Sequence, residues 1–346
     1  MSLQIAIIPA GAWGTAIALP AAEGGNDVRL WRRHPGWSRE WQGGHPALPG
    51  LVLPANARAF EEVEEAVRGA DLVVLGSASV AVREYCRLIR PHLRPDAVLV
   101  SITKGIEVAT GLRMTEVVAQ ELPEHAGRIV ALSGPNFAHE VANGLPTGTV
   151  VACPDQRVAE FAQDALMSAR FRVYTNTDLL GVELAGALKN IIAIGAGLAD
   201  GLGMGDNARA TVITRGLTEI ARLGVKLGAN VLTFAGLAGM GDLVLTCTGN
   251  SSRNRQTGMA IGRGQAAAEF VQQRQLTVEG IPTTRAVHEL AQRLGVEMPI
   301  TEQIYRVLYE DLPPLQCVEN LMGREPRHET EEVLRQPFVI VPQQVE

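Results

Sequence analysis

Several features that mark particular classes of protein are absent from this sequence of 346 residues. It has no long basic run, and its formal net charge of -6 excludes a basic footprint for nucleic acid or for an anionic membrane surface. The opening residues, 1–8, lack the basic segment that precedes the apolar core of a signal peptide, so we expect no secretory signal. There is also no internal repeat and no low-complexity tract.

The four cysteines lie far apart in the chain, at Cys86, Cys153, Cys247 and Cys317. None forms a C-x-x-C pair, which argues against a metal site and a disulfide framework, and we expect no metal and a reducing, cytoplasmic location. No long uncharged apolar run qualifies as a membrane span. The best candidate contains Lys189 and is interrupted by glycines, so we expect no membrane insertion.

The composition is that of a folded globular protein, with 46% hydrophobic and 20% charged residues, and the length predicts about two domains. Up to Tyr174, short apolar runs alternate with amphipathic segments, a pattern typical of a parallel sheet with helices on both faces. These runs cover residues 3–8, 28–31, 72–75, 98–102, 129–132, 149–152 and 171–174. Later segments are long and helical. We therefore divide the chain into domains at 1–177 and 178–328, with a loosely held tail at 329–346.

An almost wholly apolar stretch, residues 181–197, predicts a buried helix with Lys189 in its middle and Asn190 beside it. A buried ammonium group needs a partner, a lowered pKa or a route back to water. Such a lysine exchanges a proton near neutral pH. The alternative is a lysine whose stem follows the helix while its ammonium group reaches solvent, and the segment alone favours it because most lysines are solvated.

A glycine-containing turn, Pro9-Ala-Gly11-Ala-Trp13-Gly14, follows the first predicted strand and opens a predicted helix at 14–23. Gly11 and Gly14 match the second and third glycines of G-x-G-x-x-G, which let backbone approach a pyrophosphate and let the helix pack on the strand. Pro9 replaces the first glycine and puts the geometry of the tight turn in question. A plain strand–helix turn is the alternative to a nucleotide site, and the strand–turn–helix–strand context favours the nucleotide.

Basic residues, Arg32-Arg33-His34, end the second predicted strand, where an NAD-preferring fold usually carries Asp or Glu. A guanidinium group at this point suits a 2′-phosphate through paired, charge-assisted hydrogen bonds. We therefore expect NADPH to be preferred, with NADH as the alternative cofactor. A solvated basic turn is the competing interpretation.

Together, motifs spread over residues 5–327 resemble those of bacterial NAD(P)-dependent glycerol-3-phosphate dehydrogenases, in that family's order. They are SITKGIE at 101–107, LSGPNFAHEV at 132–141, ELAGALKN at 183–190, DGLGMGDNARA at 200–210, GMGDL at 239–243, SRN at 252–254, VEG at 278–280 and MPITE at 298–302. The resemblance implies a Rossmann-like, doubly wound parallel sheet followed by an all-α domain. It also implies reversible reduction of glycerone phosphate to sn-glycerol 3-phosphate, which supplies phospholipid synthesis.

The resemblance also implies roles for individual residues. Lys189 would be the acid/base, Lys104 would add positive charge near substrate and nicotinamide, and Asp242 would fix Lys189 or bind a substrate hydroxyl. Arg253 and Asn254, in a predicted polar loop at 249–255, would hold the substrate phosphate. Further substrate contacts are expected from Gly134, Asn136 and Ser252, and cofactor contacts from Gly11, Ala12, Trp13, Gly14, Arg32, Arg33, His34, Lys104, Ala138, Arg253, Thr277 and Glu279. Without the resemblance, Lys104 reads as a surface lysine, Asp242 as a turn residue and 249–255 as a solvated turn.

Four departures from the family pattern fall in the cofactor half: Pro9, Gly-Ser-Ala-Ser at 76–79, His34 where arginine is common, and Ala47 where an aromatic residue is frequent. They leave two alternatives to an active dehydrogenase. One is a non-catalytic, metabolite-binding homologue with a degenerate nucleotide loop, and the other is a dehydrogenase of a related hydroxyacid or sugar phosphate. A helical domain rich in Gly and Ala is compatible with a homodimer. The expected partner is a small-molecule substrate, not nucleic acid.

Overall fold

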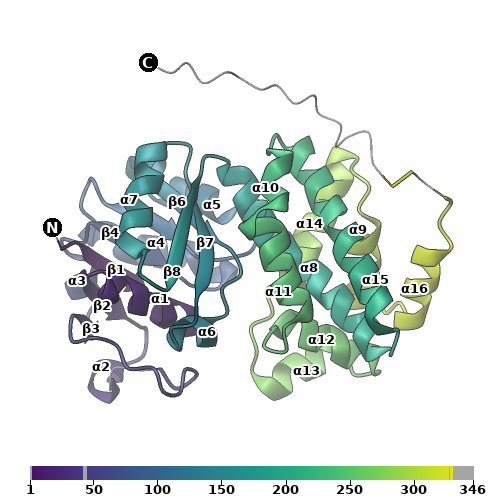
Figure 1. The fold of residues 1–346 in the computed structure, drawn as a ribbon, viewed down its shortest axis with the longest axis horizontal. Helices are drawn as coiled ribbons and strands as arrows, with labels where there is room; N and C mark the ends of the chain where they lie inside the picture. Colours follow the sequence, from purple (N-terminus) through teal and green to yellow (C-terminus); the bar gives the residue numbers. More distant parts are fainter. Residues whose placement is uncertain (1, 42–44, 327, 330–346) are drawn as a thin grey trace.

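The computed structural model describes residues 2–41, 45–326 and 328–329, arranged as an α/β part and a helical part side by side (Figure 1). The predicted tail at 329–346 lies almost wholly outside the described residues. Within them the sheet has eight strands in the order β3-β2-β1-β4-β5-β6-β7-β8. The strands are β1 (Gln4–Ile8), β2 (Asp27–Trp31), β3 (Ala57–Phe60), β4 (Leu72–Leu75), β5 (Val98–Ser101), β6 (Ile129–Ser133), β7 (Thr147–Ala152) and β8 (Phe171–Asn176).

The sheet is parallel except for the β6–β7 pair, which confirms the predicted mostly parallel α/β fold. Alternate residues of each central strand enter two separate cores. Ile5 and Ile7 of β1 pack with α1 (Ala12–Glu23) and α7 (Gln156–Leu166), whereas Ala6 and Ile8 pack on the opposite face with α4 (Val82–Ile89) and α5 (Met114–Glu121). Because successive side chains of a strand point to opposite faces of the sheet, one continuous apolar run contributes to both cores.

Strand β3 was not predicted, because it lies at the edge of the sheet and its sequence, ARAF, contains a charged residue and no continuous apolar run. Its neighbour β2 is followed in space by β1 and then β4, so the strand order reverses at β1. Ligands of doubly wound sheets bind outside the carboxyl ends of the strands at this point. The loops after β1, β4, β5 and β6 all begin at this edge.

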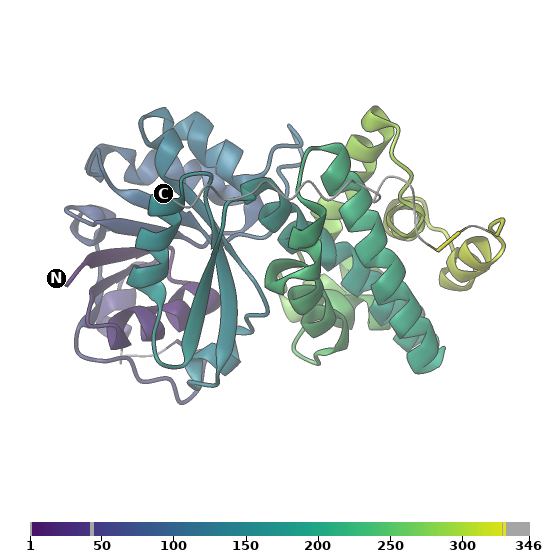
Figure 2. The same cartoon turned by 45° about the horizontal axis from the view of Figure 1, so that its top comes forward.

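The helical part is built around α8 (Leu179–Gly201), which contacts α9 (Gly205–Lys226), α11 (Asp242–Thr248), α12 (Arg253–Gly262) and α14 (Gly280–Leu294). The two views show these helices together on one side of the sheet (Figures 1 and 2). Helix α8 is long and apolar enough to cross a membrane, but 83% of its most apolar window is buried inside the fold. The predicted buried helix is therefore the core helix of this part. The other helices are α10 (Val231–Ala235), α13 (Ala267–Arg274), α15 (Pro299–Tyr309) and α16 (Pro314–Met322).

Glycines bring α12 against α8. A Cβ at Gly197 would lie 2.0 Å from the carbonyl oxygen of Arg255, and one at Gly258 would lie 2.0 Å from that of Ile194. Gly201 and Gly262 repeat the arrangement one turn further along, with backbone oxygens 2.4 and 2.5 Å from the added Cβ. Only residues without Cβ permit such an approach. The start of α12 is thereby held close to the middle of α8.

Candidate active site

One buried carboxylate joins two ammonium groups where α8 faces the sheet. Lys189, on α8, donates hydrogen bonds to Oδ1 of Asp242 and, at 2.7 Å, to Oγ1 of Thr246. Lys104, in the loop after β5, donates to Oδ2 of Asp242 at 2.7 Å and to the carbonyl of Gly134 at 2.9 Å. The exposed fractions of the Lys189 and Asp242 side chains are 8% and 1%. Lys104 and Lys189 are two of only three lysines in the chain.

Burial lowers the pKa of Lys189 to about 8, and the second ammonium group, Lys104, acts in the same direction, while Asp242 opposes both. The interpretation of Lys189 as a lysine that reaches solvent is wrong, because its side chain ends on Asp242 and Thr246. A lysine with this pKa holds and releases a proton within the physiological range. The site therefore contains a group suited to acid/base chemistry.

The ammonium group of Lys189 has three N–H donors, and Asp242 and Thr246 take two of them. Thr246 donates its own hydroxyl hydrogen to the backbone carbonyl of Asp242 at 2.7 Å, so its oxygen is left to accept from Lys189. No described residue accepts the third hydrogen. Thr246 was missed in the sequence, although residues four apart share one face of a helix, so it follows from the position of Asp242.

The predicted polar loop at 249–255 is wrong at its end, because α12 begins at Arg253. The hydroxyl oxygen of Ser252 accepts a hydrogen bond from the backbone N–H of Arg255 at 3.2 Å and caps the helix. Arg253 and Asn254 are therefore the first two helical residues, and their backbone N–H groups donate to no described residue. No acidic residue occupies the first turn, and the exposed Arg253 side chain has no ion pair among the described residues. Such a helix end suits an anion.

A short series of amide contacts connects this helix end to the lysines. Asn254 donates from Nδ2 to Oδ1 of Asn190 at 2.8 Å and accepts from the backbone N–H of Gly280 at 3.0 Å. Asn190 in turn donates to the carbonyl of Lys104 at 3.4 Å. The side chain of Asn254 is thus already hydrogen-bonded, which leaves its backbone N–H as the group open to a ligand.

The loop after β6 approaches the same centre. Gly134 has φ of +150°, and a Cβ there would lie 3.0 Å from the Cα of Thr149. Asn136 donates from Nδ2 to the hydroxyl of Thr149 at 2.9 Å, and that hydroxyl donates to the carbonyl of Ser133 at 3.0 Å. The side chain of Asn136 is therefore directed to β7, whereas the Gly134 carbonyl is directed to Lys104.

The turn after β1 forms with Pro9 in it. The backbone N–H of Ala10 donates to the carbonyl of Trp31 at 2.7 Å, and that of Gly11 donates to the carbonyl of Pro9 at 2.9 Å. Neither bond uses an N–H on residue 9, so both form with proline in the turn. The helix begins at Ala12, two residues before the predicted start at Gly14.

The residues of this turn fit a pyrophosphate. A Cβ at Gly11 would meet no atom within 4 Å, whereas one at Gly14 would lie 3.0 Å from Ile7 and from the carbonyl of Pro9. The backbone N–H groups of Ala12, Trp13 and Gly14 donate to no described residue, and the first turn of α1 has no acidic residue. Ala138, which opens α6 (Ala138–Ala142), packs into the core beside α1. An open approach at Gly11 and free donors at the start of a helix are what a nucleotide phosphate requires.

The three basic residues at the end of β2 differ in their surroundings. Arg33 forms an ion pair with Glu84 and lies 5.1 Å from the ring centre of Tyr85. His34 is exposed, and its Nδ1 lies 3.0 Å from the carbonyl of Pro35. Arg32 contacts no carboxylate of a described residue, and its Nη1 lies 3.5 Å from Nε2 of His45. Arg32 is therefore the guanidinium group that remains available for an anion.

The two remaining predicted cofactor residues precede α14. The carboxylate of Glu279 accepts from the backbone N–H of Ser79 at 3.0 Å and from its hydroxyl at 2.6 Å. This contact joins the helical part to the loop after β4, in which the chain departs from the family pattern. Thr277 is exposed, two residues before Glu279.

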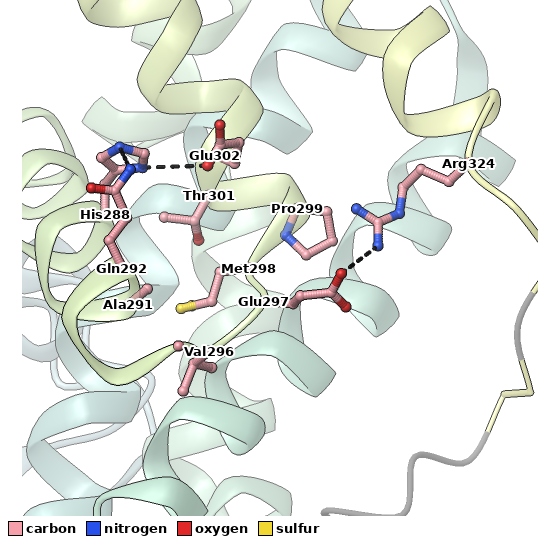
Figure 3. Close-up of a pocket in the computed structure, with 11 residues that line it drawn as sticks. His288, Ala291, Gln292, Val296, Glu297, Met298, Pro299, Thr301, Glu302 and Arg324 are labelled. Carbon is pink, nitrogen blue, oxygen red and sulfur yellow. Dashed lines mark hydrogen bonds and ion pairs between the residues drawn. The ribbon is translucent and has the colours of Figure 1, made fainter.

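A separate cavity of about 320 Å³ lies beside α14 and the start of α15, and none of the predicted site residues lines it (Figure 3). Its polar lining includes His288, Gln292, Glu302 and Arg324, and Thr301 connects it to the buried Glu219 of α9. The Glu219 carboxylate accepts from the backbone N–H groups of Ile300 and Thr301, at the start of α15.

Comparison with known proteins identifies relatives over almost the whole chain. The models of the N-terminal and C-terminal regions of NAD-dependent glycerol-3-phosphate dehydrogenase match residues 4–159 and 178–319. A glycerol-3-phosphate dehydrogenase (NAD(P)+) of Symbiobacterium thermophilum is 65% identical over 340 residues, which are 97% of this chain and 99% of the relative. The crystal structure of glycerol-3-phosphate dehydrogenase from Coxiella burnetii has a TM-score of 0.87 and 40% identity, over 93% of this chain and 99% of that one. A ketopantoate reductase from Ralstonia eutropha, 17% identical with a TM-score of 0.58, shares the fold alone.

Proposed function

We infer that this chain, which belongs to the NAD-dependent glycerol-3-phosphate dehydrogenase family, is an NAD(P)-dependent enzyme that interconverts glycerone phosphate and sn-glycerol 3-phosphate. One observation carries the inference for this chain in particular. The Asp242 carboxylate holds Lys189 and Lys104 together, beside a helix end whose donors are free. These are the elements that a phosphorylated ketone needs for reduction.

Lys189 acts as the acid in reduction and as the base in oxidation. Its third N–H points to no described partner and is therefore free to donate to the oxygen on the reacting carbon as that oxygen gains negative charge. Asp242 and Thr246 fix the direction of the ammonium group. Lys104 adds a second positive charge, which stabilises the developing alkoxide.

The start of α12 binds the substrate phosphate. The backbone N–H groups of Arg253 and Asn254 and the guanidinium group of Arg253 supply hydrogen bonds and positive charge. Ser252 caps this helix, and Asn254 holds it to Asn190, directly after Lys189. The phosphate-binding helix end and the acid/base are thereby held on two helices that contact each other.

The nicotinamide cofactor, when bound, supplies or receives the hydride at the reacting carbon. This chain would hold its pyrophosphate at Gly11, Ala12, Trp13 and Gly14, with Ala138 beside them. The other expected contacts are Arg32, His34, Lys104, Arg253, Thr277 and Glu279. Arg32 at the ribose end supports a preference for NADPH over NADH. We further propose that the enzyme needs no metal, acts in the cytoplasm and supplies phospholipid synthesis. A helical part rich in Gly and Ala is compatible with a homodimer.

The decisive experiment follows the loss of absorbance of NADPH and of NADH with glycerone phosphate. We expect oxidation of both, with the larger kcat/KM for NADPH. A folded protein that oxidises neither would be the non-catalytic homologue, and one that accepts only other hydroxyacid or sugar-phosphate partners would be the related dehydrogenase. A clear preference for NADH would refute the assignment of Arg32 to a 2′-phosphate.

Substitution Lys189→Ala tests the role of the acid/base. We expect kcat to fall by orders of magnitude while the Kd of NADPH stays within about twofold, because the proton donor is lost and the cofactor turn is untouched. Lys226→Ala, at the end of α9, is the matched control and should behave as the wild type. A Lys189→Ala enzyme with near wild-type turnover would show that another group transfers the proton.

A further inference from the structure

Two hydrogen-bond donors face each other at the end of β2. Nη1 of Arg32 and Nε2 of His45 are 3.5 Å apart, and both side chains are partly buried. We propose that Arg32 and His45 together bind the 2′-phosphate of NADPH, and that Arg33 does not. This proposal rests on the cofactor preference given under the proposed function and assigns it to specific residues.

The protonation of His45 follows from its neighbour. The backbone N–H of Ala47 lies 3.1 Å from Nδ1 of His45, and a backbone N–H can only donate. Nδ1 is therefore the acceptor, so the ring is neutral and its proton is on Nε2. Arg32 likewise has donors only. The contact between Arg32 and His45 thus brings two N–H groups together with no acceptor between them.

This pair is completed by an anion. Within the described part of the chain, neither the guanidinium group of Arg32 nor Nε2 of His45 has a hydrogen bond to an oxygen atom. Burial and, to a smaller extent, the charge of Arg32 lower the pKa of His45, which favours the neutral ring. A phosphate offers several acceptor oxygens to converging donors, and hydrogen bonds to a charged group are roughly twice as strong as neutral ones. The 2′-hydroxyl of NADH is uncharged and therefore offers the same two donors a weaker acceptor than a phosphate does.

The position of the pair fits a ribose. Arg32 directly follows Trp31, whose carbonyl accepts the backbone N–H of Ala10 in the turn after β1 at 2.7 Å. In a doubly wound sheet the ribose of a dinucleotide lies at the end of this second strand. The Arg32–His45 pair at the end of β2 is therefore next to the turn after β1, whose backbone N–H groups would bind the pyrophosphate.

Arg33 is excluded by its own contacts. Its guanidinium group forms an ion pair with Glu84 through Nη1 and stacks over Tyr85, so its charge already has a carboxylate partner. Nearly half of the Arg33 side chain is solvent-exposed, at 47%, which weakens any pair with an incoming charge. The two neighbouring arginines therefore have different roles.

The test measures the binding of 2′,5′-ADP and of 5′-AMP to the full-length protein by calorimetry, because these probes differ only in the 2′-phosphate. We expect His45→Ala and Arg32→Ala each to raise the Kd of 2′,5′-ADP by about tenfold or more, with the Kd of 5′-AMP within about twofold. Arg33→Ala should change either Kd by less than about threefold. His45→Gln, which retains an N–H near the position of Nε2, should recover part of the affinity.

A matched control is His92→Ala, a partly buried histidine in a short helix at 90–92 after α4. The proposal is overturned if His45→Ala leaves the Kd of 2′,5′-ADP unchanged, or if Arg33→Ala weakens it as much as Arg32→Ala does. A wild-type protein that binds 2′,5′-ADP no more tightly than 5′-AMP refutes the NADPH preference and this pair together. That result leaves the dehydrogenase activity itself intact, because it is measured separately with NADH.

Discussion

Replacing Asp242 with Asn tests whether one carboxylate sets the proton affinity of Lys189. The variant keeps the size of the side chain and removes its charge. Lys189 and Asp242 are almost fully buried and in direct contact, so their attraction is little screened by water. At an effective permittivity of about 20, two unit charges about 4 Å apart attract by about 4 kcal/mol.

This energy translates into a shift of the pH profile. About 1.4 kcal/mol corresponds to a tenfold change in proton affinity, so the loss of Asp242 should move the inflection by about three pH units. The direction is toward acid, because Asp242 raises the pKa of Lys189 from a value already lowered by burial. Lys104, which shares the carboxylate, would then repel Lys189 without compensation.

The assay is kcat/KM for glycerone phosphate across the pH range, at saturating NADPH. In the wild type we expect a plateau below about pH 8 and a fall above it, because reduction needs protonated Lys189. In Asp242→Asn the fall should begin about three pH units lower. Asp206→Asn, at a carboxylate that is 86% exposed, should retain the wild-type profile. An inflection in Asp242→Asn within about one pH unit of wild type would refute the reasoning.

Three further predictions concern packing, orientation and pH. Gly197→Ala should destabilise the protein by about 1–3 kcal/mol and raise KM for glycerone phosphate, because the added Cβ collides with the α12 backbone. The control is Gly195→Ala, which should be neutral because its Cβ would meet side chains at 3.5 Å or more. Equal effects of the two substitutions would contradict the prediction. Thr246→Val should lower kcat about tenfold without changing the Kd of NADPH, because Lys189 loses an orienting acceptor; unchanged kcat would show that Asp242 suffices. Burial raises the pKa of Glu219 from 4.5 to about 7, so the folded protein binds an extra proton between these values and loses stability as pH rises through them, by about 3 kcal/mol in total. Tm measured against pH should show this loss in the wild type but not in Glu219→Gln, and identical slopes would argue against it.

The local pattern of apolar residues was sufficient to predict most strands of the sheet. The runs at 72–75, 98–102 and 129–132 correspond to β4, β5 and β6 within one residue. Such runs are recognisable because burial on both faces of a parallel strand demands continuous apolar sequence. The edge strand β3 was not predicted, because it is buried on fewer sides and tolerates the charged residue Arg58. The start of α12 was misplaced because Ser252 was read as part of a polar loop, although it is a helix cap.

The sequence by itself determined the two-part plan, the buried helix around Lys189 and the family to which the motifs belong. These depend on hydrogen bonding and side-chain periodicity over a few residues, which are local properties. Only the tertiary structure decided which charges meet. Asp242 is 53 residues from Lys189 and 138 from Lys104, and no spacing rule relates positions so far apart. The same holds for Arg32 and His45, 13 residues apart across a loop. Such contacts arise because the sheet and the packed helices bring distant segments together, and they convert one lysine in an apolar helix into an acid of adjusted strength.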